Sequence, residues 1–233
     1  MLVKGLYKRG LTMQYSTEIL FKSSTGLVNF VIIEESLAQL YEYCGETLYF
    51  TKNKLIEYNN TRNNFSIGNE KIKFISKDEE DIFHSSLYLD GLEIVAIPQW
   101  QENYEFVAPS MFLVMIWMFL EKSLKDLAYS FSEGSRGVEI PAGERFKIKL
   151  KENESVVDAS FRYLKEINRF DFELDNDIYT LLETCRAIRN DFAHGDWANV
   201  RKSIKTINLD DAFKTLSSIF YEIECGAPKV FSK

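Results

Sequence analysis

The chain has 233 residues, of which 45% are apolar, 27% charged and 14% aromatic. This composition is typical of a globular protein with a sizeable core, and it excludes a disordered chain, which would contain few aromatic residues. The formal net charge of −7 at pH 7 excludes a generally basic surface, so nucleic acid would have to bind at a local basic patch.

The N-terminal residues are predicted to form one strand and then one helix. Residues 14–26 favour the strand. In residues 27–45, apolar side chains such as Ile33 and Leu37 recur with helical spacing, and Gly45 is a typical C-terminal stop. We therefore expect the first helix to end at this glycine.

The next stretch, residues 46–98, is predicted to form a β-meander. Short apolar runs alternate with polar residues there, and turn residues separate the runs. Gly68-Asn69 suggests one hairpin, and Asp90-Gly91, between two alternating runs, is a strong signal for another. We therefore expect a β-rich N-terminal half, residues 1–104, to which the sequence assigns no role.

The most apolar stretch is Phe106–Leu120, which contains no charged residue. It is shorter than the roughly 20 apolar residues that a membrane-spanning helix needs. Pro109 or Ser110 is a typical helix start, and helical spacing of apolar residues continues without a break to Phe131. We therefore expect a buried core helix and no membrane contact.

The second half of the chain, residues 105–233, is predicted to be a helical bundle. Its segments have amphipathic spacing and short connections, so that each helix can bury an apolar stripe on its neighbours. The predicted helices are residues 109–131, 155–170, 175–195 and 209–226, with a short one at 196–206. With the N-terminal half, this predicts an α+β fold that contains an up-and-down bundle of four to five helices.

Polar residues and glycines mark the ends of these predicted helices. Ser155, with Asp158 three residues later, forms an acidic variant of the capping box. Asp196 is a candidate N-cap of the short helix, and Gly195 and Gly226 are typical C-terminal stops. These residues predict the helix boundaries more sharply than the apolar spacing does.

The residues most suggestive of chemistry lie between Cys185 and Trp197. Arg189 follows Cys185 by four residues, on or beside the buried stripe of its helix, where a cation without a partner is unfavourable. Asn190 is next, and His194 follows Arg189 by five residues. Five residues rotate a side chain by about 140° on an ideal helix, so the arginine and histidine would not meet within one regular helix.

Two arrangements would bring Arg189 and His194 together. The helix could unwind at His194, just before Gly195, or two copies of the chain could meet across a two-fold axis. Structural roles are the alternatives: His194 could cap the last helical carbonyls, and Arg189 could form an ion pair with Glu183 or Asp191.

The sequence RNDFAHG, Arg189–Gly195, resembles the signature of HEPN domains, in which a histidine follows an arginine after four to six residues. Asn190 and Gly195 also match residues that several branches of the family have there. The resemblance covers about residues 105–226. It implies a bundle of four or five helices that forms a homodimer, in which the motifs of two subunits make one composite site.

Many HEPN domains are metal-independent endoribonucleases of toxin–antitoxin, abortive-infection and phage-defence systems. The resemblance therefore implies an endoribonuclease whose catalytic residues are Arg189, Asn190 and His194. The histidine would act as general base or acid while an RNA 2′-OH attacks the adjacent phosphate, and the arginine would stabilise the growing charge. One alternative is a non-catalytic HEPN-like module for dimerisation or RNA binding. Another is an unrelated helical interaction protein in which the motif is accidental.

One branch of the family is controlled by a nucleotidyltransferase antitoxin that modifies a tyrosine two residues after the histidine. This chain has Asp196 at that position, and Trp197 follows it. The resemblance therefore does not extend to that form of regulation.

Two basic patches are candidates for RNA contact, one in residues 136–151 and one in residues 201–205. A solvated charged surface is the alternative interpretation of each. The candidate RNA-binding residues are Arg145, Lys147, Lys149, Arg201 and Lys202.

The three cysteines are far apart and form no C-x-x-C pair, which predicts free thiols and a cytoplasmic protein. Histidines and cysteines are too few and too scattered for a metal cluster, and no glycine-rich phosphate loop is present, so we expect neither a metal nor a cofactor. The expected partners are a second copy of the chain, an RNA substrate, and an antitoxin or activator protein. If the chain is a ribonuclease, its N-terminal half would recognise an activator, an antitoxin or a substrate.

Overall fold

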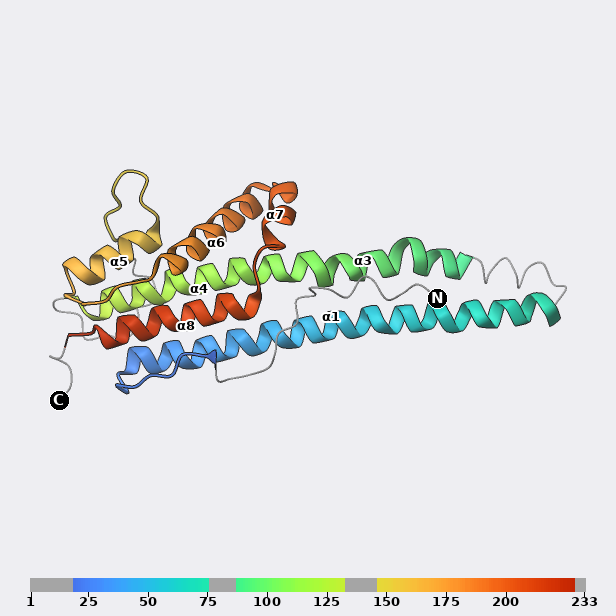
Figure 1. The fold of residues 1–233 in the computed structure, drawn as a ribbon, viewed down its shortest axis with the longest axis horizontal. Coiled ribbons are helices and arrows are strands. Elements are labelled where there is room, and N and C mark those ends of the chain that lie inside the picture. Colours follow the sequence, from blue (N-terminus) through green and yellow to red (C-terminus); the bar gives the residue numbers. More distant parts are fainter. Residues whose placement is uncertain (1–18, 76–86, 133–145, 229–233) are drawn as a thin grey trace. The chain divides into compact units, whose positions relative to one another are not determined.

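A computed structural model describes residues 19–75, 87–132 and 146–228, without the side chains of residues 66–75 (Figure 1). Of these described residues, 78% lie in helices and none lies in a strand. The expectation of an α+β fold is therefore wrong for this part of the chain, which is all-α.

The helical elements follow one another with few interruptions. In chain order they are α1 (Val28–Ile75), η2 (Gly91–Ala96), α3 (Ile97–Glu102), η3 (Asn103–Val107), α4 (Ala108–Ser130), α5 (Val156–Glu166), α6 (Asn176–His194), α7 (Trp197–Ile204) and α8 (Leu209–Cys225). The η elements are π-helical, and with α3 and α4 they belong to one continuous helix, Leu87–Ser130.

The described residues divide into two compact units. The first unit comprises residues 43–75 and 87–109, and the second comprises residues 19–42, 110–132 and 146–228. Two long helices contribute to both units, because α1 passes residue 43 and the continuous helix passes residue 109. Residues 19–42 pack with the C-terminal helices, whereas the sequence placed them in a separate N-terminal half.

The first unit is an antiparallel pair of helices. The Phe50 and Trp100 rings lie 5.9 Å apart, those of Tyr58 and Trp100 6.4 Å, and those of Phe65 and Tyr88 4.8 Å. Later residues of α1 therefore contact earlier residues of the second helix, as expected for antiparallel helices. The buried residues of this pair include Cys44, Leu48, Thr51, Leu92, Ile97, Phe106 and Ala108.

The predicted strands of residues 46–98 are helical wherever the structure describes them. The segments 47–51 and 64–75 belong to α1, and residues 87–98 belong to the second helix of the pair. Short apolar runs are compatible with a strand or a helix, and aromatic and β-branched residues have helix propensities within about 0.7 kcal/mol of alanine. Packing of the two helices on each other therefore decides in favour of the helix.

The predicted turns and stops are absent from the described part of this region. Asp90 has φ −60° and ψ −40°, which is α-helical, whereas a two-residue hairpin turn of the predicted type needs positive φ. Gly45 and Gly68 both lie inside α1, so the predicted end of the first helix is wrong. Residues 19–26 form no strand, and residues 14–18 lie outside the described residues.

Two prolines lie inside the continuous helix, and each follows a π-helical segment. Pro98 follows η2 and Pro109 follows η3. In η3, the N–H of Ala108 donates to the carbonyl of Asn103, five residues back, which widens the turn before Pro109. A proline ring clashes with the carbonyl four residues earlier in a regular α-helix, and the wider turn relieves this clash. The predicted helix start at Pro109 is therefore wrong.

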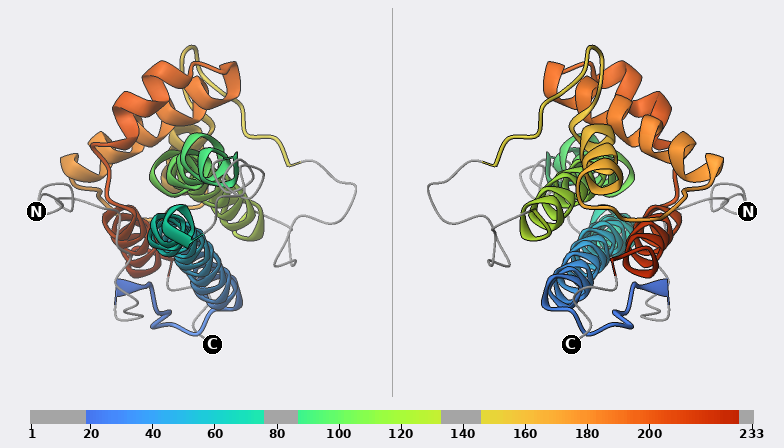
Figure 2. Two further views of the ribbon diagram at one scale, coloured as in Figure 1. Left: turned by 90° about the vertical axis from the view of Figure 1, so that its right-hand side faces the viewer. Right: turned by 90° about the vertical axis from the view of Figure 1, so that its left-hand side faces the viewer.

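The core of the second unit is formed by the first part of α1 together with α4 and α8, which lie side by side in Figures 1 and 2. The Tyr41 and Phe213 rings meet edge to face at 4.9 Å, and the Phe119 and Phe220 rings do so at 5.9 Å. The fully buried side chains of this core include Phe30, Leu37, Leu113, Ile116, Leu120, Leu124, Phe213 and Phe220.

The remaining helices of the second unit begin and end close to where the sequence predicts. Ser155 Oγ accepts a hydrogen bond from the Asp158 N–H at 3.1 Å at the start of α5, so the predicted cap is confirmed. Asp196 likewise caps α7 by accepting from the Asn199 N–H at 3.2 Å. These boundaries depend on contacts between residues close in sequence, which is why local patterns predict them.

The segment before α1 is held against α8 by one buried carboxylate. Glu224, with 2% of its surface exposed, accepts hydrogen bonds from the backbone N–H groups of Ser24 and Thr25. It also accepts from the hydroxyls of Ser23, Ser24 and Thr25. This cluster fixes the entry to α1 on the end of α8.

Candidate functional site

The arginine and histidine of the motif lie in the last two turns of α6. Asp175 is the N-cap of this helix, and Gly195 ends it with φ 73° and ψ 21°, a left-handed conformation that glycine adopts readily. The side chains of Leu182, Cys185 and Ile188 are buried, so one face of α6 packs into the second unit. The predicted stop at Gly195 is confirmed.

Arg189 follows the buried Ile188 and is itself half-buried. Its Nη1 donates a hydrogen bond to Oδ1 of Asn190 at 3.0 Å. Glu183, one of its two predicted ionic partners, pairs instead with Arg186 at 2.7 Å. Among the described residues no ion pair to Arg189 occurs, and its guanidinium is oriented by the neutral side chain of Asn190.

His194 is exposed and is the last residue of α6. Because the helix continues through this residue, the predicted unwinding that would turn the ring toward Arg189 does not occur. The ideal spacing of about 140° between the two side chains therefore applies. The structure brings Arg189 together with Asn190 but does not gather Arg189 and His194 into one site within a single chain.

A tight turn joins α6 to α7 and holds the residues next to His194. The Gly195 N–H donates to the carbonyl of Phe192 at 3.2 Å, and the Asp196 N–H donates to the carbonyl of Asp191 at 2.8 Å. Trp197 is the first residue of α7, and its ring meets the Phe192 ring edge to face, with 5.1 Å between the ring centroids. The backbone and these two rings therefore give the turn a defined conformation.

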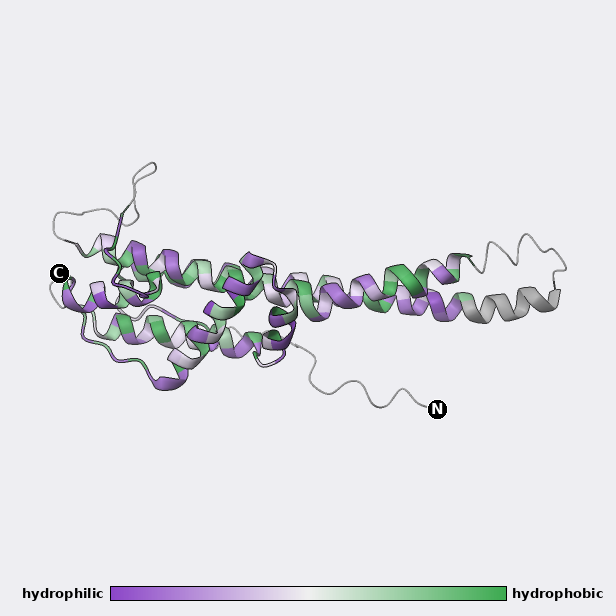
Figure 3. Cartoon of the chain, turned by 90° about the horizontal axis from the view of Figure 1, so that it is seen from above, coloured by the Kyte–Doolittle hydropathy of each residue, from purple (hydrophilic) through white to green (hydrophobic). Residues whose placement is uncertain are grey.

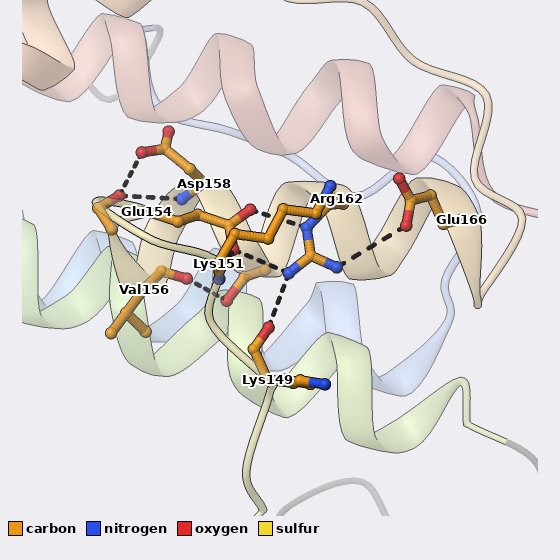
Figure 4. Close-up of polar contacts among 9 residues, drawn as sticks. Lys149, Lys151, Glu154, Val156, Asp158, Arg162 and Glu166 are labelled. Atoms are coloured by element: carbon orange, nitrogen blue, oxygen red, sulfur yellow. Dashed lines mark hydrogen bonds and ion pairs between the residues drawn. The ribbon is translucent and has the colours of Figure 1, made fainter.

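The first predicted basic patch is partly described. Arg145 lies outside the described residues, and Lys147 and Lys149 are exposed on the segment that precedes α5. Arg162 fastens this segment: its Nε and Nη2 donate to the two carboxylate oxygens of Glu154 at 2.7 and 2.8 Å (Figure 4). Its Nη2 also donates to the backbone carbonyl of Lys149 at 2.7 Å, which holds the lysine-bearing segment on α5.

The ion pair between Arg162 and Glu154 changes the titration of the carboxylate. The hydrogen bond from Arg162, together with one from the Lys151 N–H, lowers the pKa of Glu154 to about 2. The same carboxylate raises the pKa of Arg162. The attachment of the segment therefore persists at all but strongly acidic pH.

The second predicted basic patch lies on α7, where Arg201 and Lys202 are exposed, and Lys205 at the end of the helix is exposed as well. In Figure 1 α7 and the segment before α5 lie at opposite ends of α6. The structure therefore does not bring the two predicted patches together, and only the second lies next to His194 in the chain.

One groove and two buried thiols are formed by residues outside the motif. A groove of about 210 Å³ is lined by residues of α1 and α4, among them Ser36, Ser123 and Asp126. Burial raises the pKa of both the Cys44 and the Cys185 thiols to about 12, which makes them poor nucleophiles. Within the described ranges, no three side chains of the usual metal-ligating types are grouped together.

The continuous helix Leu87–Ser130 is long and apolar enough to cross a membrane, a property that core helices of soluble proteins share. Of its most apolar window, 56% is buried inside the protein. Figure 3 shows hydrophobic and hydrophilic residues mixed along the long helices. Absence of membrane contact stays a prediction.

Trp197 is the residue beside the motif whose setting the sequence did not reveal. It is 48% exposed, follows His194 by three residues, and precedes the cations of α7. The sequence feature that could have indicated it is an aromatic residue in the first turn of a short helix whose other large exposed residues are polar or basic.

Comparison of the chain with known protein families, with curated proteins and with solved structures found no match.

Proposed function

We propose that the chain is a metal-independent endoribonuclease of the HEPN type, active as a homodimer. The observation that carries the proposal is the end of α6, where an arginine without an ionic partner among the described residues precedes an exposed histidine and a left-handed glycine. This pattern agrees with the HEPN resemblance of RNDFAHG. Toxin or phage-defence activity in the cytoplasm is the role that the resemblance favours.

The proposed reaction is a transesterification at one RNA phosphate. The 2′-oxygen forms a bond to phosphorus while the bond from phosphorus to the 5′-oxygen breaks, leaving a 2′,3′-cyclic phosphate and a 5′-hydroxyl. One His194 takes the proton of the 2′-OH, and the His194 of a second copy gives a proton to the leaving oxygen. The planar Arg189 guanidinium binds the phosphate oxygens as their charge grows, and Asn190 holds it in place.

The geometry within one chain supports a site shared between two copies. His194 remains in helix α6, on another side of it from Arg189, so one chain presents the two groups in different directions. Two α6 ends that face each other across a two-fold axis would supply each phosphate with both groups. A protein that is strictly monomeric at the assay concentration would contradict this arrangement.

The first unit is the proposed surface for an antitoxin or activator protein. Its two helices expose large apolar side chains, whereas soluble proteins usually cover such groups when they cluster. The exposed residues are Tyr43, Tyr49, Phe50, Ile56, Leu87, Tyr88, Ile94 and Val95. A partner protein that co-purifies with the wild-type chain, and no longer co-purifies with the Phe50→Ser, Ile94→Ser double variant, would support this assignment.

The activity is tested with purified protein and total RNA in the presence of EDTA. Wild-type protein should cleave RNA to products with 2′,3′-cyclic phosphate ends, and His194→Ala should lose about 10²- to 10⁴-fold of the rate, as for removal of a general acid or base. Arg189→Ala should lose about 10²- to 10³-fold, and Arg189→Lys should not restore the rate because lysine lacks the planar fork.

Matched controls come from the same helix. Arg186→Ala removes an arginine whose partner is Glu183, and it should leave the rate unchanged. Added His194→Ala protein should lower the activity of wild-type protein, because a mixed dimer has only one of the two histidines that the proposed reaction uses at the shared site. RNA binding without cleavage by wild-type protein would favour the alternative, a non-catalytic HEPN-like module for dimerisation or RNA binding.

A further inference from the structure

The only exposed tryptophan of the chain lies beside the proposed catalytic histidine. All three tryptophans are described: Trp117 is 3% exposed, Trp100 is packed against Phe50 and Tyr58, and Trp197 is 48% exposed. A large aromatic surface is normally buried, because its exposure to water is unfavourable. The exposure of Trp197 is therefore unfavourable in the free chain, and a ligand that covers the ring would remove this cost.

The tryptophan ring is held in place although it is exposed. It meets the Phe192 ring edge to face at 5.1 Å, and Phe192 is on α6, two residues before His194. A Cβ atom built on Gly195 would lie 3.9 Å from Nε1 of the indole, so the ring lies over the residue that follows the histidine. The ring is thus an anchored surface adjacent to His194.

Cations accompany the ring on the same short helix. Arg201 follows Trp197 by one helical turn, and Lys202 and Lys205 are exposed further along. The acidic residues of the same stretch of sequence are Asp191, which is half-buried, and Asp196, whose side chain accepts two hydrogen bonds from Asn199. Residues 189–205 contain four cationic and two acidic side chains, so this stretch is basic within an acidic chain.

An aromatic ring bordered by cations is the combination that binds single-stranded nucleic acid. Bases of every kind stack on aromatic rings, and neighbouring cations attract the phosphates. A base inside a duplex is already stacked on both sides and is not accessible to such a ring. The chemistry of α7 therefore suits an unpaired nucleotide and does not suit a helical stem.

We infer that Trp197 stacks on an unpaired base next to the phosphate that His194 serves, with Arg201 and Lys202 binding the flanking phosphates, so that single-stranded RNA is the substrate. This inference rests on the proposed ribonuclease function for the identity of the ligand. Stacking on Trp197 would position the nucleotide, and His194 would transfer a proton at the adjacent phosphate.

The test is a binding measurement in full-length protein that carries His194→Ala, so that RNA is not cleaved. The probes are a 12-nucleotide oligouridylate and the same strand annealed to oligoadenylate. Replacing Trp197 by Ala or Leu should weaken binding of the single strand by about 5- to 150-fold, the effect of losing one stacked base. Trp197→Phe keeps an aromatic face and should retain most of the affinity. Binding of the duplex should not depend on Trp197.

A fluorescence readout separates stacking from a purely structural role. In a protein that also carries Trp100→Phe, the remaining tryptophans are the buried Trp117 and the exposed Trp197. Single-stranded RNA should quench the Trp197 emission, because a stacked base deactivates the excited indole. Unchanged emission on saturation with oligouridylate would overturn the inference. Equal affinity of the His194→Ala protein with and without Trp197→Leu would overturn it as well.

The two proposals fail in different ways. If wild-type protein does not cleave RNA but oligouridylate binding still requires the aromatic ring at position 197, the ribonuclease proposal fails and the stacking site stands. If His194-dependent cleavage occurs and Trp197→Ala binds and cleaves single-stranded RNA like the wild type, the stacking site is wrong and the ribonuclease proposal stands.

Discussion

Glu224→Gln tests whether the buried carboxylate of α8 holds the segment before α1 in place. Five donors of Ser23, Ser24 and Thr25 converge on its two oxygens, three on Oε1 and two on Oε2. Glutamine has the same shape but only one acceptor oxygen, and its amide group would face donors. At least one backbone N–H then loses its acceptor in a buried place.

The size of the effect follows from these contacts. Hydrogen bonds to a charged group contribute about 1.5–3 kcal/mol, and a buried donor without an acceptor costs about 1–3 kcal/mol. Because the five bonds share one carboxylate and are not additive, we expect a loss of about 2–4 kcal/mol in the free energy of unfolding. At about 2–4 °C per kcal/mol for a protein of this size, the melting temperature should fall by several degrees or more.

The effect should depend on pH in a defined direction. Burial by itself raises the pKa of Glu224, but the hydrogen bonds from Ser23, Ser24 and Thr25 outweigh it and place the pKa below its ordinary value. The carboxylate therefore stabilises the fold fully above the unfolded-state pKa of about 4.3, and this stabilisation is lost as the pH falls through the lower folded-state pKa. The difference between wild type and Glu224→Gln should be large at pH 7 and shrink in strong acid.

Urea unfolding and amide hydrogen exchange measure this prediction. The N–H groups of Ser24 and Thr25 should lose protection in Glu224→Gln, since they donate directly to the carboxylate. Glu222→Gln, two residues away on the same helix, is the matched control for removing one charge. A loss below about 0.5 kcal/mol at pH 7, the usual scale of a surface substitution, would refute the reasoning.

Three further predictions concern other local contacts. Arg162→Ala should raise the pKa of Glu154 from about 2 toward its ordinary value, and it should speed tryptic cleavage at the lysines before α5. Arg186→Ala is the control. Unchanged cleavage in Arg162→Ala would contradict the role of the ion pair. Gly195→Ala should cost about 1–2 kcal/mol of stability in urea unfolding because φ is 73°, whereas Gly195→Asn should cost less; equal losses would argue against backbone strain. A thiol reagent at pH 8 should modify one cysteine rapidly, the exposed Cys225, since burial raises the pKa of the other two to about 12; rapid loss of two thiols, or rapid labelling of a Cys225→Ser protein, would contradict this.

The sequence by itself determined the features that depend on residues close in the chain. The caps at Ser155 and Asp196, the left-handed stop at Gly195 and the order of the C-terminal helices follow from side chains that bond to backbone groups within three or four residues. The motif Arg189–His194 belongs to this class too, because its position at the end of α6 depends on that same stop.

Only the tertiary structure decided the state of the first unit and the geometry around the motif. The buried side chains of α1 recur every three or four residues from Phe30 to Thr51, which is helical spacing. Beyond Gly45 the short apolar runs were also compatible with strands, and packing against the partner helix decided in favour of one continuous helix. Packing likewise sets Trp197 against Phe192 and leaves Arg189 bonded to Asn190. Such contacts depend on which surfaces meet in space, and residues within a few positions of each other do not encode that choice.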